Sequence, residues 1–255
     1  MIQESFAAGN SPIHRLSPTL RVVAAAAYSF IVALAHGLPT LLTSLAISII
    51  LLFFARLNLK KVFQRFTVVL GFLLLIWVIL PWTYKGEIWF HLGPLAITRP
   101  GVLLCLEISL KSIAILLAMI TLVSTMTTAR MGHTLNRLHL PDKLVYLILI
   151  TYRYIFVIEQ EYQRLMRAAR IRNFRPGSNL HTYRTYAYLL GMLFVRSAER
   201  AKRVHLAMVC RGFSGKFYSL QENTRGYQNW VFALLMSLSL LGLAILEIST
   251  PAILI

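Results

Sequence analysis

Acidic residues are scarce in this 255-residue sequence: nine Asp and Glu stand against 26 Lys and Arg, and the formal net charge is +17. Charged residues of both signs make up 14% of the chain, whereas 57% of it is hydrophobic. This composition is more apolar than that of a soluble domain and indicates a polytopic membrane protein with a cationic cytosolic face. A basic chain often binds nucleic acid, but these apolar runs would still need burial in lipid, so we expect no nucleic-acid partner.

The groups that metal proteins and ATPases require are also sparse or missing. Cys105 lies in an apolar run and Cys210 in a basic segment, so we expect neither a disulfide nor a cysteine metal cluster. The seven histidines are scattered, and even His133 and His139 have no acid between them. The chain has no Gly-x-x-x-x-Gly-Lys-Ser/Thr loop, so it should not bind ATP itself. We therefore expect no catalytic residue, no metal site and no cofactor.

Long uncharged runs predict the membrane spans of an all-α protein. Val22 to Ala55 has 34 residues without Lys, Arg, Asp or Glu. As one helix this run would be about 51 Å long, whereas a span needs about 20 residues, so a turn at His36 to Pro39 should divide it. The first 18 residues are polar, and no cleavable signal peptide is expected. The five predicted spans are residues 20–36, 39–55, 66–84, 102–124 and 226–246.

A sixth apolar stretch, Leu144 to Ile158, is interrupted by Arg153 and is either a sixth span or a half-immersed helix.

Within the span 102–124, Glu107 and Lys111 are four residues apart. Charged groups at membrane depth point to function by default, but here the favoured interpretation is an ion pair near the interface.

Lys and Arg are distributed unevenly between the loops. The 56–65 loop has four of them and the 83–101 loop has two, whereas residues 126–228 have 17 against five acids. The positive-inside rule places the N-terminus, the 56–65 loop and residues 126–228 in the cytosol, with the 83–101 loop outside. The predicted organisation is a four-span region (1–125), cytosolic coupling helices (126–225) and a C-terminal span (226–255).

Helical periodicity in the basic segment predicts helices near 128–138, 142–173 and 182–212, with a clear break at 175–179. The plainest interpretation is a solvated helical hairpin with salt bridges, in which Glu199 pairs with Lys202 and Arg203. The concentration of charge between apolar helices favours a docking platform instead.

A repeated pattern supports the docking interpretation. Two stretches 39 residues apart share the form Arg-x-x-x-Ala-x-x-x-Arg-x-Phe. The first copy is Arg164, Ala168, Arg172 and Phe174, and the second is Arg203, Ala207, Arg211 and Phe213. Arg172 precedes Asn173 and Arg211 precedes Gly212, and both Asn and Gly readily adopt the left-handed conformation of a helix C-cap. One copy alone would be an ordinary helix end, but two matched copies indicate a paired interface, and the planar guanidinium is suited to gripping carboxylates or carbonyls.

At these residues the sequence resembles the transmembrane T component of energy-coupling-factor transporters, the cobalt/nickel type often called CbiQ. That family carries two Ala-Arg-Gly signatures at the ends of cytoplasmic coupling helices. They correspond here to "IRN" at 171–173 and "CRG" at 210–212. The resemblance is specific over residues 140–215 and looser in the spans. Both arginines are present, although Ile and Asn replace Ala and Gly in the first signature and Cys replaces Ala in the second.

The resemblance implies a non-catalytic scaffold in a bacterial or archaeal inner membrane. Two cytosolic ATP-binding subunits would each receive one helix end, and a separate substrate-binding membrane protein, the S component, would be tilted across the bilayer. The resemblance implies an ATPase-coupling site made of Ala168, Arg172, Asn173, Phe174, Ala207, Arg211, Gly212 and Phe213.

The cargo would be cobalt or nickel, and the alternative is a T component of a vitamin importer. A membrane-embedded enzyme is disfavoured because the spans offer only Glu107, Lys111 and scattered hydroxyls as catalytic groups. A basic segment that binds anionic lipid or RNA would explain the charge but not the two matched helix ends.

Overall fold

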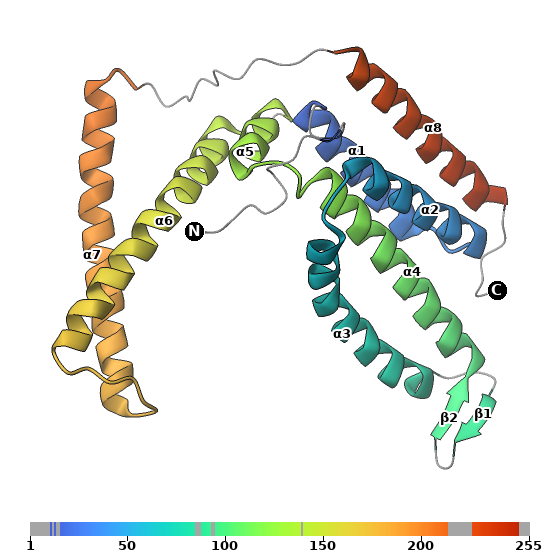
Figure 1. Ribbon diagram of the computed structural model, residues 1–255, viewed down its shortest axis with the longest axis horizontal. Coiled ribbons are helices and arrows are strands. Elements are labelled where there is room, and N and C mark those ends of the chain that lie inside the picture. The colour runs from blue at the N-terminus through green and yellow to red at the C-terminus, as the bar shows by residue number, and fades with distance from the viewer. Residues whose placement is uncertain are drawn as a thin grey trace. The chain divides into compact units, whose positions relative to one another are not determined.

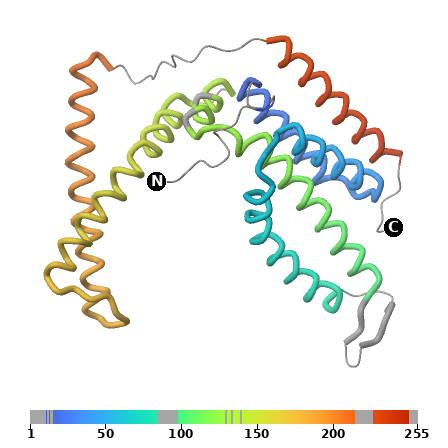
Figure 2. Tube along the Cα trace, viewed as in Figure 1, coloured from blue at the N-terminus to red at the C-terminus, as the bar shows by residue number. Residues whose placement is uncertain are grey.

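The computed structural model describes residues 11, 13, 16–84, 88–92, 95–138, 140–213 and 226–249. Helices dominate this part of the chain, which confirms the predicted all-α polytopic fold, with one short β-hairpin in addition (Figure 1). The elements are α1 (Pro18–Leu34), α2 (Leu38–Ala55), α3 (Leu59–Thr83), β1 (Ile88–Leu92), β2 (Leu95–Thr98), α4 (Arg99–Leu122), α5 (Thr128–Arg137), α6 (Asp142–Ile171), α7 (Leu180–Cys210) and α8 (Tyr227–Ser249). Figure 2 traces the same path as a tube.

The described residues form two compact units. The span unit comprises residues 11–127 and 226–249, with α1 to α4, the β-hairpin and α8. The basic unit comprises residues 128–213, with α5, α6 and α7.

Four described helices are long and apolar enough to cross a membrane, namely α2, α3, α4 and α8, and α1 is a shorter apolar helix of 17 residues. The predicted turn between the first two spans is confirmed, since α1 ends at Leu34 and α2 begins at Leu38. Pro39 lies in the first turn of α2, where its missing N–H costs little. The third helix begins at Leu59 rather than near residue 66, because basic residues exclude a segment from lipid without preventing it from being helical.

Large apolar side chains cover the outside of the span unit. Phe53 is 83% exposed, Val68 78% and Ile248 88%. Exposed apolar surface on this scale is unfavourable in water, and lipid is the solvent that it fits.

Buried hydrogen bonds between hydroxyl and carbonyl groups join helices inside the span unit. The hydroxyl of Tyr28, which is fully buried, donates to the backbone carbonyl of Ser44 at 2.6 Å and lies 2.7 Å from the Ser48 hydroxyl. Ser48 in turn donates to the carbonyl of Ala114 at 2.8 Å. These bonds join α1, α2 and α4, whose serine and alanine side chains allow the helices to approach closely.

Two arginines bind the segment that leads out of α4 towards the basic unit, residues 123–127. Arg21 of α1 is fully buried, and its Nη1 donates to Thr125 Oγ1 at 2.9 Å. Arg65 of α3 donates from Nη1 to Ser124 Oγ at 3.1 Å. The sequence analysis did not single out Arg21, because nothing local indicates that an arginine near a helix start will be buried.

A polar cluster joins three spans at the α1–α2 turn. The predicted Glu107–Lys111 pair is confirmed, with Lys111 Nζ 2.7 Å from Glu107 Oε1. His36 Nδ1 lies 2.8 Å from the same oxygen. From α8, the Glu247 carboxylate accepts hydrogen bonds from the backbone N–H groups of His36 at 2.7 Å and Gly37 at 3.3 Å. A carboxylate at the start of α2 is favourable because it faces the positive end of the helix dipole.

The stretch between α3 and α4 contains a hairpin that the sequence analysis does not predict. Within the expected 83–101 loop, β1 and β2 pair antiparallel, with Ile88 opposite Thr98 and Leu92 opposite Leu95. Aromatic residues of β1 and β-branched residues of both strands favour extended pairing.

The basic unit follows the predicted helices closely, with α5, α6 and α7 ending within two residues of the expected positions. The break falls at 172–179, between α6 and α7. The apolar stretch 144–158 is the first half of the 30-residue helix α6. This helix is not among the four that meet the length and composition of a span.

Candidate functional site

The end of α6 forms a Schellman motif, in which two backbone N–H groups beyond the helix bond back to its last carbonyls. The N–H of Asn173 donates to Arg170 O at 3.0 Å, and the N–H of Phe174 donates to Ala169 O at 3.1 Å. Asn173 has a φ of 66°, which is the left-handed conformation that this motif requires.

The end of α7 repeats this geometry. The N–H of Gly212 donates to Val209 O at 2.9 Å, and the N–H of Phe213 donates to Met208 O at 3.0 Å. Gly212 has a φ of 77°, and a Cβ added there would meet no atom within 4 Å. Glycine is therefore favoured at this position by backbone conformation and not by a lack of space.

The shared motif places Arg172 and Arg211 at equivalent positions, each the last residue before the left-handed turn. Both side chains are exposed. Among the residues that the structure describes, neither guanidinium forms a hydrogen bond or an ion pair. Ala168 and Ala207, one turn earlier, are also exposed, so no long side chain from these positions covers the arginines.

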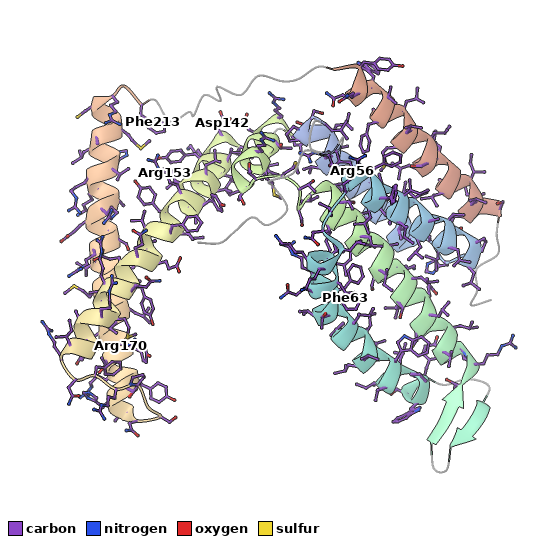
Figure 3. The ribbon with its side chains drawn as sticks, in the orientation of Figure 1. Arg56, Phe63, Asp142, Arg153, Arg170 and Phe213 are labelled. Carbon is purple, nitrogen blue, oxygen red and sulfur yellow. The ribbon has the colours of Figure 1, made fainter. Side chains whose placement is uncertain are left out.

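The two phenylalanines of the motif anchor each helix end to the other helix. Phe174 is buried and meets Tyr186 of α7 edge to face, with ring centroids 5.7 Å apart. Phe213, just beyond α7 (Figure 3), stacks on Tyr146 of α6 at 5.3 Å. The predicted coupling site includes both phenylalanines, and the structure places each ring against the neighbouring helix.

Between the two helix ends, α6 and α7 border a groove of about 460 Å³. An ion pair crosses it, because Glu161 of α6 accepts a hydrogen bond from Arg196 of α7. Arg164 lies 3.4 Å from the same carboxylate. The hydrogen bond from Arg196 and the positive charges around it lower the pKa of Glu161.

This ion pair replaces the one expected from the sequence. The predicted pairing of Glu199 with Lys202 and Arg203 is wrong: over residues 140–213, Glu199 has no cation within salt-bridge distance, and all three side chains are exposed. Exposed pairs on one helix gain little energy, whereas Arg196 reaches Glu161 because the two helices pack together. The i, i+3 spacing of Glu161 and Arg164 is visible in the sequence. The second partner, Arg196, depends on how α6 and α7 are aligned along each other.

Metal-ligating residues do not gather in the described ranges: no three His, Cys, Asp or Glu side chains there are arranged to hold an ion. Cys105 is buried and Cys210 exposed, and both are free thiols. The histidines 133 and 139 fall on positions whose side chains lie outside the description.

Comparison with known proteins gives one family and several relatives. The family model CbiQ, described as cobalt transport protein, matches residues 9–223. An uncharacterized protein of Methanocaldococcus jannaschii is 27% identical over 218 residues, which cover 83% of this chain and 81% of that protein. The energy-coupling factor transporter transmembrane protein EcfT of Limosilactobacillus fermentum is 27% identical over 238 residues, covering 87% and 85%. The cobalt transport protein CbiQ of Salmonella typhimurium is 31% identical over 128 residues, covering 49% and 56%.

Proposed function

Because the chain belongs to the CbiQ family of cobalt transport proteins, we propose that its basic unit docks onto two cytosolic ATP-binding subunits through Arg172 and Arg211. The observation that carries this proposal is the repeated helix end, in which two exposed arginines occupy the same position in the same motif. Each guanidinium presents a planar fork of donors that suits carboxylates and backbone carbonyls.

The other residues of the motif serve these arginines. Ala168 and Ala207 leave room for a partner surface, and Asn173 and Gly212 form the left-handed turns. Phe174 and Phe213 fix the turns against the neighbouring helix through the aromatic contacts described above. The proposed site is therefore two preformed helix ends, each receiving one subunit.

The chain is a transmembrane transporter component and a multi-pass protein of the cell membrane. We infer that it is a non-catalytic subunit in a bacterial or archaeal inner membrane, that its partners hydrolyse ATP, and that a separate S component binds the cargo. ATP-driven closure of the two subunits would move α6 and α7, and this movement would tilt the S component across the membrane.

We propose cobalt or nickel as the cargo, since the family description names cobalt. A vitamin importer is the second candidate. The relative that aligns over 87% of this chain, EcfT, has no metal in its name, whereas the relative named for cobalt aligns over 49%. Affinity purification of the tagged chain in mild detergent, followed by mass spectrometry, would identify the accompanying ATP-binding and substrate-binding subunits. A chain that purifies without nucleotide-binding partners would contradict the proposed function.

The proposed orientation has the N-terminus and the basic unit in the cytosol and the 83–101 loop outside. Single cysteines replacing Phe90 and Ser178, introduced after removal of Cys105 and Cys210, test it with an impermeant thiol reagent. Labelling from outside should tag position 90 and miss position 178, and the reverse pattern would contradict the orientation.

The cargo and ATP are expected to bind elsewhere in the complex. Purified alone, the chain should bind neither ATP nor Co²⁺ or Ni²⁺ with useful affinity. Stoichiometric micromolar binding in a calorimetric titration would contradict this expectation.

A further inference from the structure

A shallow groove of about 550 Å³ lies between α3 and α4, beside the first turns of α3. Its volume falls within the range of about 300–1,000 Å³ that is usual for small-molecule sites. Val62 and Leu117 are its most buried lining residues, at 5% and 7% exposure, whereas Leu59 and Phe63 are each 68% exposed. The groove is therefore apolar within and open along one side.

Basic residues gather at the same end of α3. Lys60 lines the groove itself, and Lys61 and Arg56 are close to it in sequence (Arg56 and Phe63 are labelled in Figure 3). All three cations are exposed, and residues 56–65 contain no acid. Over the ranges that the structure describes, none of the three forms an ion pair.

The start of α3 adds to this positive potential. Lys60 and Lys61 occupy its first turn, next to the positive end of the helix dipole, where acidic residues are normally favoured. The first turn has no acidic residue, and the N-cap residue Asn58 makes no side-chain capping bond. A bound anion would relieve the repulsion between these charges.

We propose that this groove binds an anionic phospholipid. The acyl chain lies against Val62, Phe63 and Leu117, and Lys60 and Lys61 bind the phosphate of the headgroup. Each half of the site alone would be unremarkable in a membrane protein, but an apolar groove with a cationic mouth selects a ligand that is both apolar and anionic. The site is separate from the proposed docking of ATP-binding subunits and does not depend on it.

Native mass spectrometry of the whole chain tests this assignment. The protein is equilibrated in detergent with equal amounts of phosphatidylglycerol and phosphatidylcholine, and the retained lipids are counted. Retention of phosphatidylglycerol should exceed that of phosphatidylcholine, and the excess should fall about fivefold for each lysine changed to glutamine in Lys60→Gln and Lys61→Gln.

The matched control is the double variant Lys143→Gln and Lys202→Gln, which removes the same charge from exposed positions on α6 and α7. This control should keep the preference for phosphatidylglycerol. The proposal is overturned if the Lys60/Lys61 variant keeps the full preference, or if the control loses as much of it. Thermal unfolding of each variant in detergent shows whether a loss of lipid reflects a loss of fold.

Two further measurements distinguish binding of a phospholipid from binding of a simple anion. Ile113→Phe narrows the groove without changing charge and should lower retention of phosphatidylglycerol. Inorganic phosphate at millimolar concentration should not displace the lipid. If phosphate displaces it completely and Ile113→Phe has no effect, the lysines bind only a free anion and the lipid assignment is wrong.

Discussion

In the span unit the buried Tyr28 connects α1 to α2, and Ser48 connects α2 to α4. In the basic unit, α7 has 31 residues and buries only Thr182. Packing against other elements supplies most of the stability of helices in proteins. A long helix that buries so little therefore gains little stability from packing. The contacts that join α6 and α7 include the aromatic pairs at their ends and the Glu161–Arg196 ion pair.

The exposed apolar side chains of the two units also differ in their surroundings. On the span unit they lie on helices that are long and apolar enough to face lipid. On the basic unit, Ile171 is 86% exposed, Leu180 81% and Phe194 77%, and they lie among many arginines. This contrast favours a span unit that is complete once lipid surrounds it and a basic unit that needs partner proteins. Substitutions in the two units should therefore separate stability from assembly.

The largest effect is expected from removing both arginines. Arg172→Ala with Arg211→Ala should abolish transport, and each single change should weaken docking of an ATP-binding subunit roughly ten- to a hundredfold. Charge-assisted hydrogen bonds contribute about 1.5–3 kcal/mol, and 1.4 kcal/mol is a factor of ten. Pull-down titrations against the partner subunits would measure the change, and Arg211→Lys should restore docking only in part.

Lys202→Ala is the matched control for general loss of charge, because Lys202 is exposed on α7 and lies outside the motif. Arg200 is a weaker control than its position suggests, since it lines the α6–α7 groove near Glu161. Equal impairment by Lys202→Ala and Arg211→Ala would mean that the basic face acts diffusely, and the specific docking site would be wrong.

A smaller effect is expected from the turn that presents the arginine. Gly212→Ala should lower docking by up to about thirtyfold, because alanine in the left-handed conformation costs about 1–2 kcal/mol and a smaller fraction of molecules then holds Arg211 in place. Gly191→Ala is the control: Gly191 lies inside α7 with open space around its Cα, and alanine there should leave docking unchanged. Similar docking by Gly212→Ala and the wild type would show that the preformed turn is unimportant.

In the span unit the expected pattern is reversed. Tyr28→Phe removes a buried hydroxyl with two partners and should lower stability by about 0.5–1.5 kcal/mol, with docking unchanged. Thermal unfolding in detergent measures the first effect and the pull-down titration the second. Tyr227→Phe, at a tyrosine that is 84% exposed, should change neither. A docking defect in Tyr28→Phe with normal stability would break the separation between the units.

The smallest effect concerns pH. Because Arg196 lowers the pKa of Glu161 in the folded protein, the pairing stabilises the basic unit above the ordinary glutamate value of 4.5. That contribution is lost as the pH falls through the lowered pKa. Glu161→Gln should remove this part of the pH dependence of thermal unfolding, whereas Glu199→Gln should leave it in place. Identical pH profiles for the wild type and Glu161→Gln would contradict the assignment.

Much of the geometry at the two helix ends was predictable because helix capping is local. A left-handed residue after a helix needs only a Gly or Asn in the right place, and Asn173 and Gly212 supply it. The positions of Arg172 and Arg211 then follow from the spacing. The inward direction of Phe174 was not predictable, since it depends on Tyr186, twelve residues further along and across the turn.

By itself, the sequence determined the helical class, the apolar spans and the two matched helix ends, because hydropathy, charge and capping act over a few neighbouring residues. Only the tertiary structure decided that Arg21 is buried against Thr125, that Glu161 pairs with Arg196, and that a groove lies beside Lys60. Each of these depends on which faces of distant helices meet. That register is set by the packing of many side chains at once, which no single stretch of sequence specifies.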